Sequence, residues 1–137
     1  QPRSRGLGDV YKRQAVYFGV PVVFAKKSAG SNMDKEMFAT EVMSYTHNRK
    51  NHVVVSKKYL KPGEHILIMD DFLANGCAVS GLLDLVKQAG GIVEGVGICI
   101  EKGFQGGGDA LREAGYDVRS LAVIEKMDAE TGVITFR

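Results

Sequence analysis

The stretch HILIMDDFLANGCA, residues 65–78, joins an apolar run to two adjacent carboxylates and a loop that contains a glycine. The continuous apolar run His65–Met69 is typical of a parallel strand covered on both faces. Cys77–Ala89 has apolar residues at helical spacing, and Gly90–Gly91 would end that helix. The order of strand, loop (Asp70–Gly76) and helix predicts one unit of an α/β fold.

Further elements are expected on both sides of this unit. They are a buried parallel strand at Val20–Ala25, a loop at Lys26–Lys35, a strand at Ile92–Ile100, a flexible loop at Gly103–Gly108, a helix from an Asp109 N-cap through Ala114, a strand at Val118–Ile124 and a short edge strand at Val133–Phe136. The alternation predicts a doubly wound, mainly parallel α/β sheet. Ligands bind beyond the carboxyl ends of such strands, which points to Asp70–Ala78 and Glu101–Gln105.

One segment does not fit the parallel pattern. Phe38–Tyr45 and His52–Ser56 could pair as antiparallel strands around the strongly polar turn Thr46–Asn51. Lys61–Glu64 then forms a turn before the central strand. We expect the antiparallel pair to be a mobile flap rather than part of the core sheet.

The loop after the central strand carries groups suited to a sugar phosphate. The N-terminus of the following helix offers free N–H groups and a partial positive charge, which suit a phosphate. Gly76 allows the backbone to approach the phosphate, and Asn75 can donate from its side chain. Asp70 and Asp71 can accept from sugar hydroxyls and stabilise positive charge on the sugar ring. The alternative is a polar exit from the core followed by a turn; the combination favours a site.

Bulk composition excludes several classes of function. The chain has 137 residues, which fits one domain, with 45% hydrophobic residues, 25% charged residues and a net charge of +2. This balance argues against nucleic-acid binding through a basic face. No apolar run approaches the roughly 20 residues of a membrane span, and no secretory signal is visible.

Histidine and cysteine placement predicts no metal ligands. His47, His52 and His65 lack ligand spacing to one another. Cys77 is interpreted as a small loop residue rather than a nucleophile, and Cys99 as a core residue. The two cysteines fit a reducing, cytoplasmic setting.

Residues 1–14 (QPRSRGLGDVYKRQ) are basic and lack an apolar period. They resemble a translated sequencing adapter joined to a truncated gene; the alternative is a disordered native arm. We therefore expect a non-native or disordered leader over residues 1–14 and a partial domain over residues 15–137.

The segment Ile66–Ala78 resembles the signature of the type I phosphoribosyltransferases, which is an apolar strand, two acidic residues, a four-residue loop, then glycine and small residues. The resemblance implies that Ala74, Asn75, Gly76, Cys77 and Ala78 cradle the 5′-phosphate of phosphoribosyl diphosphate. It also implies that Asp70 and Asp71, the expected catalytic pair, hold the ribose hydroxyls. The fold implied is the sheet of that family with an antiparallel flap.

Two runs, DDFLANG and EKGFQ (residues 101–105), are similar to the xanthine-using branch of that family. In that branch the lysine at the position of Lys102 contacts the purine oxygen; the alternative is a solvated surface lysine. Many members have threonines in the loop, and the hypoxanthine–guanine branch has an aspartate base where this chain has Ala74. A site without a base should favour xanthine, which ionises more easily than hypoxanthine or guanine.

The resemblance implies an enzyme of purine salvage. It would transfer the phosphoribosyl group from phosphoribosyl diphosphate to xanthine, giving XMP and diphosphate, with Mg²⁺ held mainly through the diphosphate. A homodimer is implied too. Because the family's diphosphate loop and part of its base pocket should precede Val16, we expect weak or absent turnover by this chain alone.

Two other identities remain open from the sequence. The purine-operon repressors carry a similar domain that senses phosphoribosyl diphosphate without catalysis, although their loop tends to read Lys-Ala-Gly-Gly-Thr and the EKxFQ segment is lacking. The adenine-specific salvage enzyme normally keeps threonines in its loop, which this chain lacks. Ala74-Asn75-Gly76 and Glu101-Lys102 favour the xanthine-using enzyme over the repressor domain.

Overall fold

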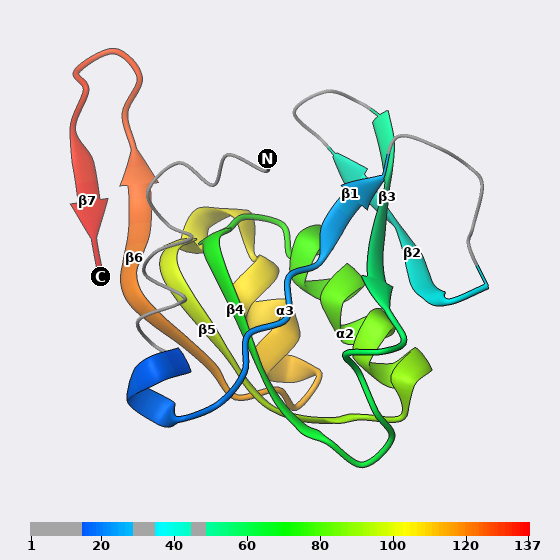
Figure 1. Ribbon diagram of the computed structural model, residues 1–137. Helices are drawn as coiled ribbons and strands as arrows, with labels where there is room; N and C mark the ends of the chain where they lie inside the picture. The colour runs from blue at the N-terminus through cyan, green and yellow to red at the C-terminus, as the bar shows by residue number, and fades with distance from the viewer. Residues whose placement is uncertain (1–14, 29–34, 45–48) are drawn as a thin grey trace.

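A computed structural model describes residues 15–28, 35–44 and 49–137 as two sheets and their helices (Figure 1). The larger sheet has the order β4-β5-β6-β7, built from β4 (His65–Leu73), β5 (Ile92–Lys102), β6 (Val118–Met127) and β7 (Ile134–Phe136). β4, β5 and β6 are parallel, and β7 is antiparallel to β6. The predicted α/β class with a mainly parallel sheet is confirmed.

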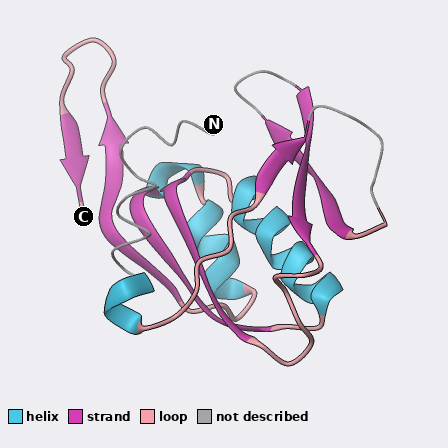
Figure 2. Cartoon of the chain, in the orientation of Figure 1, coloured by secondary structure: helices cyan, strands magenta, loops and turns pink. Residues whose placement is uncertain are grey.

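The smaller sheet is antiparallel, with the order β1-β3-β2. It consists of β1 (Lys26–Ser28), β2 (Met37–Ser44) and β3 (Arg49–Ser56). The predicted antiparallel pair is therefore confirmed and lies outside the parallel sheet, as Figure 2 shows. Residues 49–51 of the predicted turn belong to β3, whereas its residues 46–48 lie outside the described residues.

Two helices connect the parallel strands. α2 (Cys77–Ala89) links β4 to β5, and α3 (Gly107–Glu113) links β5 to β6 after a short 3₁₀ turn, η1 (Gly103–Gln105). Because β4, β5 and β6 lie side by side in chain order, right-handed crossovers place both helices on the same face of the sheet. α2 ends at Gly90, as predicted.

α2 lies between two hydrophobic clusters. On one side, Val79 and Val86 pack with strand residues of the parallel sheet such as Ile68, Val96 and Ile98. On the other, Leu85 and Ala89 pack with Val55 and Leu60, and Phe38 and Val53 of the small sheet border this cluster. A polar contact adds to this second interface, since Gln88 Nε2 donates to Ala39 O at 2.9 Å. The helix that begins at the candidate phosphate loop is thus fixed on both sides.

The prediction of a buried strand at Val20–Ala25 is wrong. These residues form no strand, and the side chains of Val20 and Phe24 are 54% and 46% exposed. A run of β-branched residues becomes a strand only when a neighbouring strand pairs with it and covers it, and these residues have no ladder partner in the described part of the chain. The strand begins later, at Lys26, within the predicted loop Lys26–Lys35.

Other boundaries differ as well. The predicted loop Asp70–Gly76 begins only after Leu73, because Phe72 and Leu73 still pair with Ile100 and Glu101. The predicted flexible loop Gly103–Gly108 is largely helical. α3 has Gly106 rather than Asp109 at its N-cap, and Asp109 lies within the first turn.

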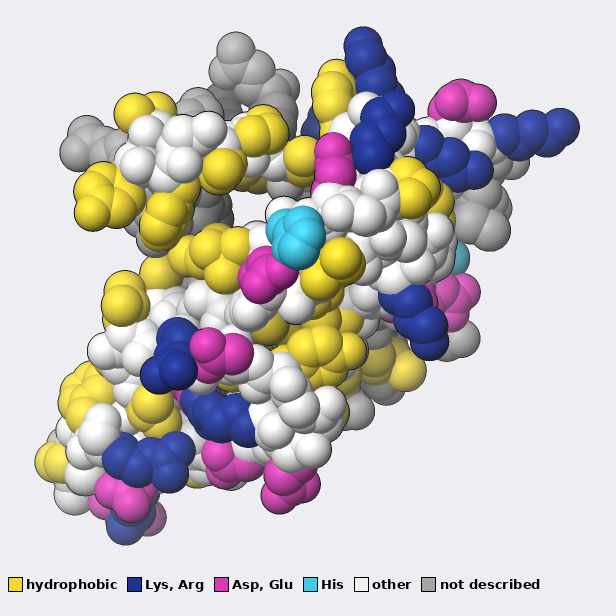
Figure 3. Space-filling view, turned by 90° about the horizontal axis from the view of Figure 1, so that it is seen from below, with side chains coloured by type: hydrophobic (Ala, Val, Ile, Leu, Met, Phe, Trp, Pro, Cys, Tyr) yellow, Lys and Arg dark blue, Asp and Glu magenta, His cyan; other side chains and the backbone are white. Residues whose placement is uncertain are grey.

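The described surface mixes charges of both signs. On the face seen from below, Lys and Arg side chains lie beside Asp and Glu side chains rather than gathering in one basic area (Figure 3). Within the described ranges, the structure contains no helix long and apolar enough to cross a membrane.

Candidate functional site

The two segments singled out by the sequence meet at one edge of the parallel sheet. Leu73 of β4 is opposite Glu101 of β5, so both strands end at the same level. The loop Ala74–Gly76 follows the first strand, and η1 follows the second. Figure 1 shows this edge at the upper end of β4 and β5, next to the N-terminus of α2.

The two aspartates occupy the end of β4. Each carboxylate accepts a hydrogen bond from the backbone N–H of the next residue: Asp71 N donates to Asp70 Oδ1 at 3.0 Å and Phe72 N donates to Asp71 Oδ1 at 2.9 Å. Burial, more than the nearby Asp71 charge, raises the pKa of Asp70 to about 6. A carboxyl group held part-buried with a raised pKa is suited to contact a polar ligand that arrives at this edge.

The loop Ala74–Gly76 turns the chain sharply from β4 into α2. Gly76 has φ 85°, which is the left-handed region that favours glycine. The N-cap residue Gly76 has no side chain to cap the helix, Asn75 Oδ1 accepts one long bond from Cys77 N at 3.4 Å, and no acidic residue lies in the first turn. Cys77 is therefore the first residue of the helix rather than a loop residue. The helix N-terminus keeps N–H groups and partial positive charge available for an anion.

Lys102 is the last residue of β5, and its side chain is half-buried. Its Nζ lies 5.7 Å from the centre of the Phe72 ring on β4. The predicted base contact and the acidic pair are therefore brought together on adjacent strands. Phe104, in η1, is 49% exposed.

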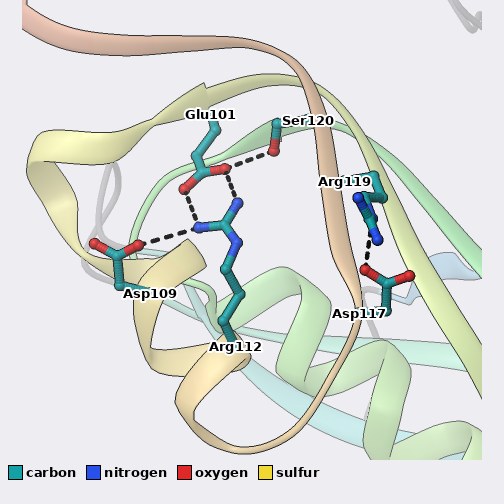
Figure 4. A network of polar contacts seen from close by, with 6 residues as sticks. All are labelled: Glu101, Asp109, Arg112, Asp117, Arg119 and Ser120. Atoms are coloured by element: carbon teal, nitrogen blue, oxygen red, sulfur yellow. Dashed lines mark hydrogen bonds and ion pairs between the residues drawn. The ribbon is translucent and has the colours of Figure 1, made fainter. Parts of the chain in front are cut away.

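An ion pair between the buried Glu101 and the partly exposed Arg112 lies next to Lys102 and was not predicted from the sequence (Figure 4). Glu101 is fully buried, and it accepts from Arg112 Nη1 at 2.9 Å, from Arg112 Nη2 at 2.6 Å and from Ser120 Oγ at 2.5 Å. The bonds from Arg112 lower the pKa of Glu101, so the carboxylate stays charged. The sequence signal that could have revealed this ion pair is the position of Glu101, a charged residue that directly follows the apolar run of a predicted strand.

Other candidates lie away from this edge or form no site. His65 is exposed at the start of β4 and pairs with Glu94, while His52 lies 3.9 Å from Glu41. Cys99 is half-buried rather than fully in the core, and both cysteines are free. Across the described ranges, no three His, Cys, Asp or Glu side chains are arranged to hold a metal ion.

Comparison with known proteins gives the family. The chain is 58% identical to a xanthine phosphoribosyltransferase of Bifidobacterium animalis subsp. lactis over 134 residues, which is 98% of this chain and 69% of that protein. The chain belongs to the xanthine phosphoribosyltransferase family. A second xanthine phosphoribosyltransferase, from Lachnoclostridium phytofermentans, is 56% identical over 123 residues, which is 90% of this chain and 63% of that protein. No protein-family model matches the chain.

Solved structures support the same fold. The adenine phosphoribosyltransferase of Thermoanaerobacter pseudethanolicus aligns with a TM-score of 0.68 and 26% identity over 82% of this chain and 61% of that one. The enzyme of Rhodothermus marinus aligns with a TM-score of 0.72 over 89% and 66%, and at 22% identity this match speaks to the fold alone. The xanthine phosphoribosyltransferase family and the phosphoribosyltransferase fold, both expected from DDFLANG and EKGFQ, are thus confirmed, and the similar proteins carry the name of the enzyme rather than of a repressor.

The chain spans between 63% and 69% of the length of these curated relatives. The residues of the described edge are those that the resemblance singled out: the acidic pair, the loop Ala74–Gly76 and Lys102.

Proposed function

We propose that the protein of which this chain forms part transfers the phosphoribosyl group of phosphoribosyl diphosphate to xanthine, releasing diphosphate and giving XMP. The observation that carries the proposal is the meeting of three features at one sheet edge: the acidic pair, a helix N-terminus with glycine at its N-cap, and Lys102. The names of the relatives agree with it.

In the proposed complex, the 5′-phosphate lies at the N-terminus of α2 and accepts from backbone N–H groups of Asn75–Ala78. The Asp70 and Asp71 carboxylates accept from the ribose hydroxyls. As the bond from C1′ to diphosphate breaks, positive charge grows on the ring, and the same carboxylates stabilise it electrostatically. The carboxylates therefore stabilise the transition state, in which the ring gains positive charge, more than the ground state, in which the ring is neutral.

Lys102 is proposed to bind the purine oxygen. Its ammonium group is compact and positively charged, so it stabilises the anionic form of the base that attacks C1′. Ala74 supplies no proton acceptor at the position where the hypoxanthine–guanine branch has an aspartate. The base must therefore lose its proton readily, which favours xanthine over hypoxanthine and guanine.

Mg²⁺ is proposed to arrive with the diphosphate. Mg²⁺ keeps several water ligands and is often bound mainly by substrate phosphates, so the diphosphate would hold it without a dedicated protein cluster. When bound, the ion neutralises charge on the leaving diphosphate. The proposal extends to a homodimer and to a cytoplasmic location, which fits the two free cysteines.

The experiment is a nucleobase panel. Xanthine, guanine, hypoxanthine and adenine are each incubated with phosphoribosyl diphosphate and Mg²⁺, and the nucleotide product is quantified. Both the chain itself and a chimaera that supplies the unmatched part of the Bifidobacterium animalis relative are tested. We expect XMP to be the main product of the chimaera and little or no turnover by the chain alone.

Asp70→Asn and Asp71→Asn test whether the activity belongs to this edge, and Asp117→Asn, an exposed aspartate on the loop before β6, is the control. Loss of XMP synthesis in the first two but not in the control supports the proposal. Absence of product with every base, together with binding of phosphoribosyl diphosphate, would instead favour the effector-sensing domain.

A further inference from the structure

Glu101 is the meeting point of three elements. It belongs to β5, its partner Arg112 belongs to α3, and Ser120 belongs to β6. Arg112 also donates to Asp109 Oδ1 at 3.1 Å, within α3. Figure 4 shows the guanidinium group between the two carboxylates. Since Arg112 forms two parallel bonds to one carboxylate, it fixes the orientation of α3 as well as its distance from β5.

The N-terminus of α3 lies against the candidate phosphate loop. Gly107 N donates to Ala74 O at 3.1 Å. A Cβ on Gly107 would overlap Ala74 O and lie 2.5 Å from Gly76 N and 2.6 Å from Asn75 C. The backbones therefore approach more closely than any side chain would allow.

The next residue faces the ion pair. A Cβ on Gly108 would overlap the Glu101 carboxylate and lie 2.9 Å from Arg112 Nη1. The short segment Gly107–Gly108 is thus held between the loop Ala74–Gly76 on one side and the Glu101–Arg112 pair on the other. Glu101 also directly precedes Lys102, so the same pair fixes the strand end from which the proposed base contact extends.

We propose that Glu101 and Arg112 are positioning residues that set the geometry of the phosphate loop and of Lys102 together. The pair touches neither substrate. It holds α3 against the loop and fixes the end of β5, so the distance between the phosphate site and the base site depends on it. The kinetic consequences of this inference rest on the proposed function. Its structural consequence, a more mobile loop Ala74–Gly76 when the pair is removed, does not.

A buried ion pair is weak support for a purely stabilising role. Burial of the Glu101 carboxylate costs desolvation free energy, which Arg112, with a side chain that is 35% exposed, only offsets, and replacement of such pairs by apolar residues is often neutral or stabilising. Removal of one partner alone is destabilising, because an unpaired charge stays buried. Stability and positioning can therefore be separated experimentally. A double variant with apolar residues at both positions should keep the fold but lose the fixed orientation of α3 relative to β5.

The test compares four proteins, each made as the chimaera described above. They are the unsubstituted protein, the double variant Glu101→Leu with Arg112→Met, the single variant Arg112→Lys, and the control Arg119→Met. Arg119 forms a single bond with Asp117 at 2.6 Å and its side chain is 83% exposed, so it matches Arg112 in type but not in position. Amide hydrogen exchange is measured over residues 74–78 and 103–110 without substrates, and kcat and KM are measured for both substrates.

We expect faster exchange over residues 74–78 in the double variant, with a loss of kcat/KM for phosphoribosyl diphosphate on the order of tenfold to a hundredfold, the size expected for a misplaced site. Arg112→Lys keeps the charge but not the paired bonds, and should give a smaller loss. Arg119→Met should match the unsubstituted protein. If the double variant does not fold, Arg112→Lys carries the comparison.

Unchanged exchange over residues 74–78 and unchanged kinetic constants in folded variants would overturn the inference. If instead the unsubstituted chimaera turns over no base, the proposed function fails, and the inference is decided by exchange at the loop alone. Faster exchange in the variants would then still support it, and equal exchange would reject it.

Discussion

Lys102 Nζ lies 5.7 Å from the centre of the Phe72 ring, across the ends of two parallel strands. The ring comes from β4, which carries the acidic pair, and the ammonium group comes from β5, which carries Glu101. A cation above an aromatic ring is attracted by about 0.5–1 kcal/mol at exposed sites. The contact restricts where the lysine can place its charge.

Phe72→Leu should raise the KM for xanthine by about two- to fivefold, because the attraction between the Lys102 ammonium group and the aromatic ring, about 0.5–1 kcal/mol, is lost. Phe72→Tyr keeps the ring and should stay within about twofold of the unsubstituted protein. The KM for phosphoribosyl diphosphate should change little in either variant. Steady-state kinetics with each substrate varied in turn check this, and an equal rise in both KM values would contradict a specific effect on Lys102.

Acidification should weaken binding of phosphoribosyl diphosphate. The pKa of Asp70 is raised to about 6 by burial, so its carboxylate takes up a proton as the pH falls through that value and no longer accepts from a ribose hydroxyl. The affinity should fall toward tenfold per pH unit below the pKa, roughly one proton per site. Calorimetric titrations between pH 8 and about 5, the range that brackets this pKa, measure it.

The matched control for that titration is Asp70→Asn, which should bind weakly with little dependence on pH in this window. The same raised pKa affects folding stability in the opposite direction. Because the folded state binds the Asp70 proton more tightly than the unfolded state does, the contribution of Asp70 to the free energy of unfolding becomes more favourable as the pH falls through about 6. Tighter binding at low pH would contradict the assigned role.

Gly76→Ala should impair the phosphate loop. Gly76 has φ 85° and Gly115 has φ 92°, and a Cβ at either position meets no atom closer than 3.6 Å. Alanine should therefore cost about 1–2 kcal/mol of backbone strain at each. Only Gly76→Ala should also raise the KM for phosphoribosyl diphosphate. Equal kinetic effects of the two variants, with chemical denaturation confirming equal stability losses, would place the phosphate elsewhere.

Arg112→Met should lower the free energy of unfolding by about 3 kcal/mol at neutral pH, because a buried carboxylate loses its partner. Hydrogen bonds from Arg112 lower the pKa of Glu101 from its ordinary 4.5. The stabilisation by the pair is therefore complete above pH 4.5 and is lost as the pH falls through the lowered value. Urea denaturation should show the difference between the two proteins shrinking below that pH, while Arg119→Met changes stability by less than about 0.5 kcal/mol.

The central unit of the fold was predictable because local signals agreed. The apolar run before Asp70 predicted β4, the apolar spacing of Cys77–Ala89 predicted α2, and Gly90 marked its end. The antiparallel pair was also visible from two apolar runs around a polar turn. In each case a pattern over a few residues is enough to specify the element.

The errors arose where distant contacts decide. Gly106–Gly108 has low helix propensity, which predicts a flexible loop. In the structure, Gly107 packs on Ala74 and Gly108 packs on Glu101 too closely for a Cβ, and α3 begins there. Val20–Ala25 has the composition of a strand, but a strand needs a neighbour that local sequence cannot supply. The Glu101–Arg112 pair joins residues on different elements, and no local pattern in the sequence predicts which elements pack together.

Amide hydrogen exchange of the chain, measured with and without phosphoribosyl diphosphate and Mg²⁺, shows where this substrate binds. We expect protection on binding to be concentrated in residues 70–78, from the acidic pair through the start of α2. Protection that spares these residues and appears elsewhere, for example in the apolar groove between Val22 and Tyr59, would show that the acidic pair and the loop are not the binding site.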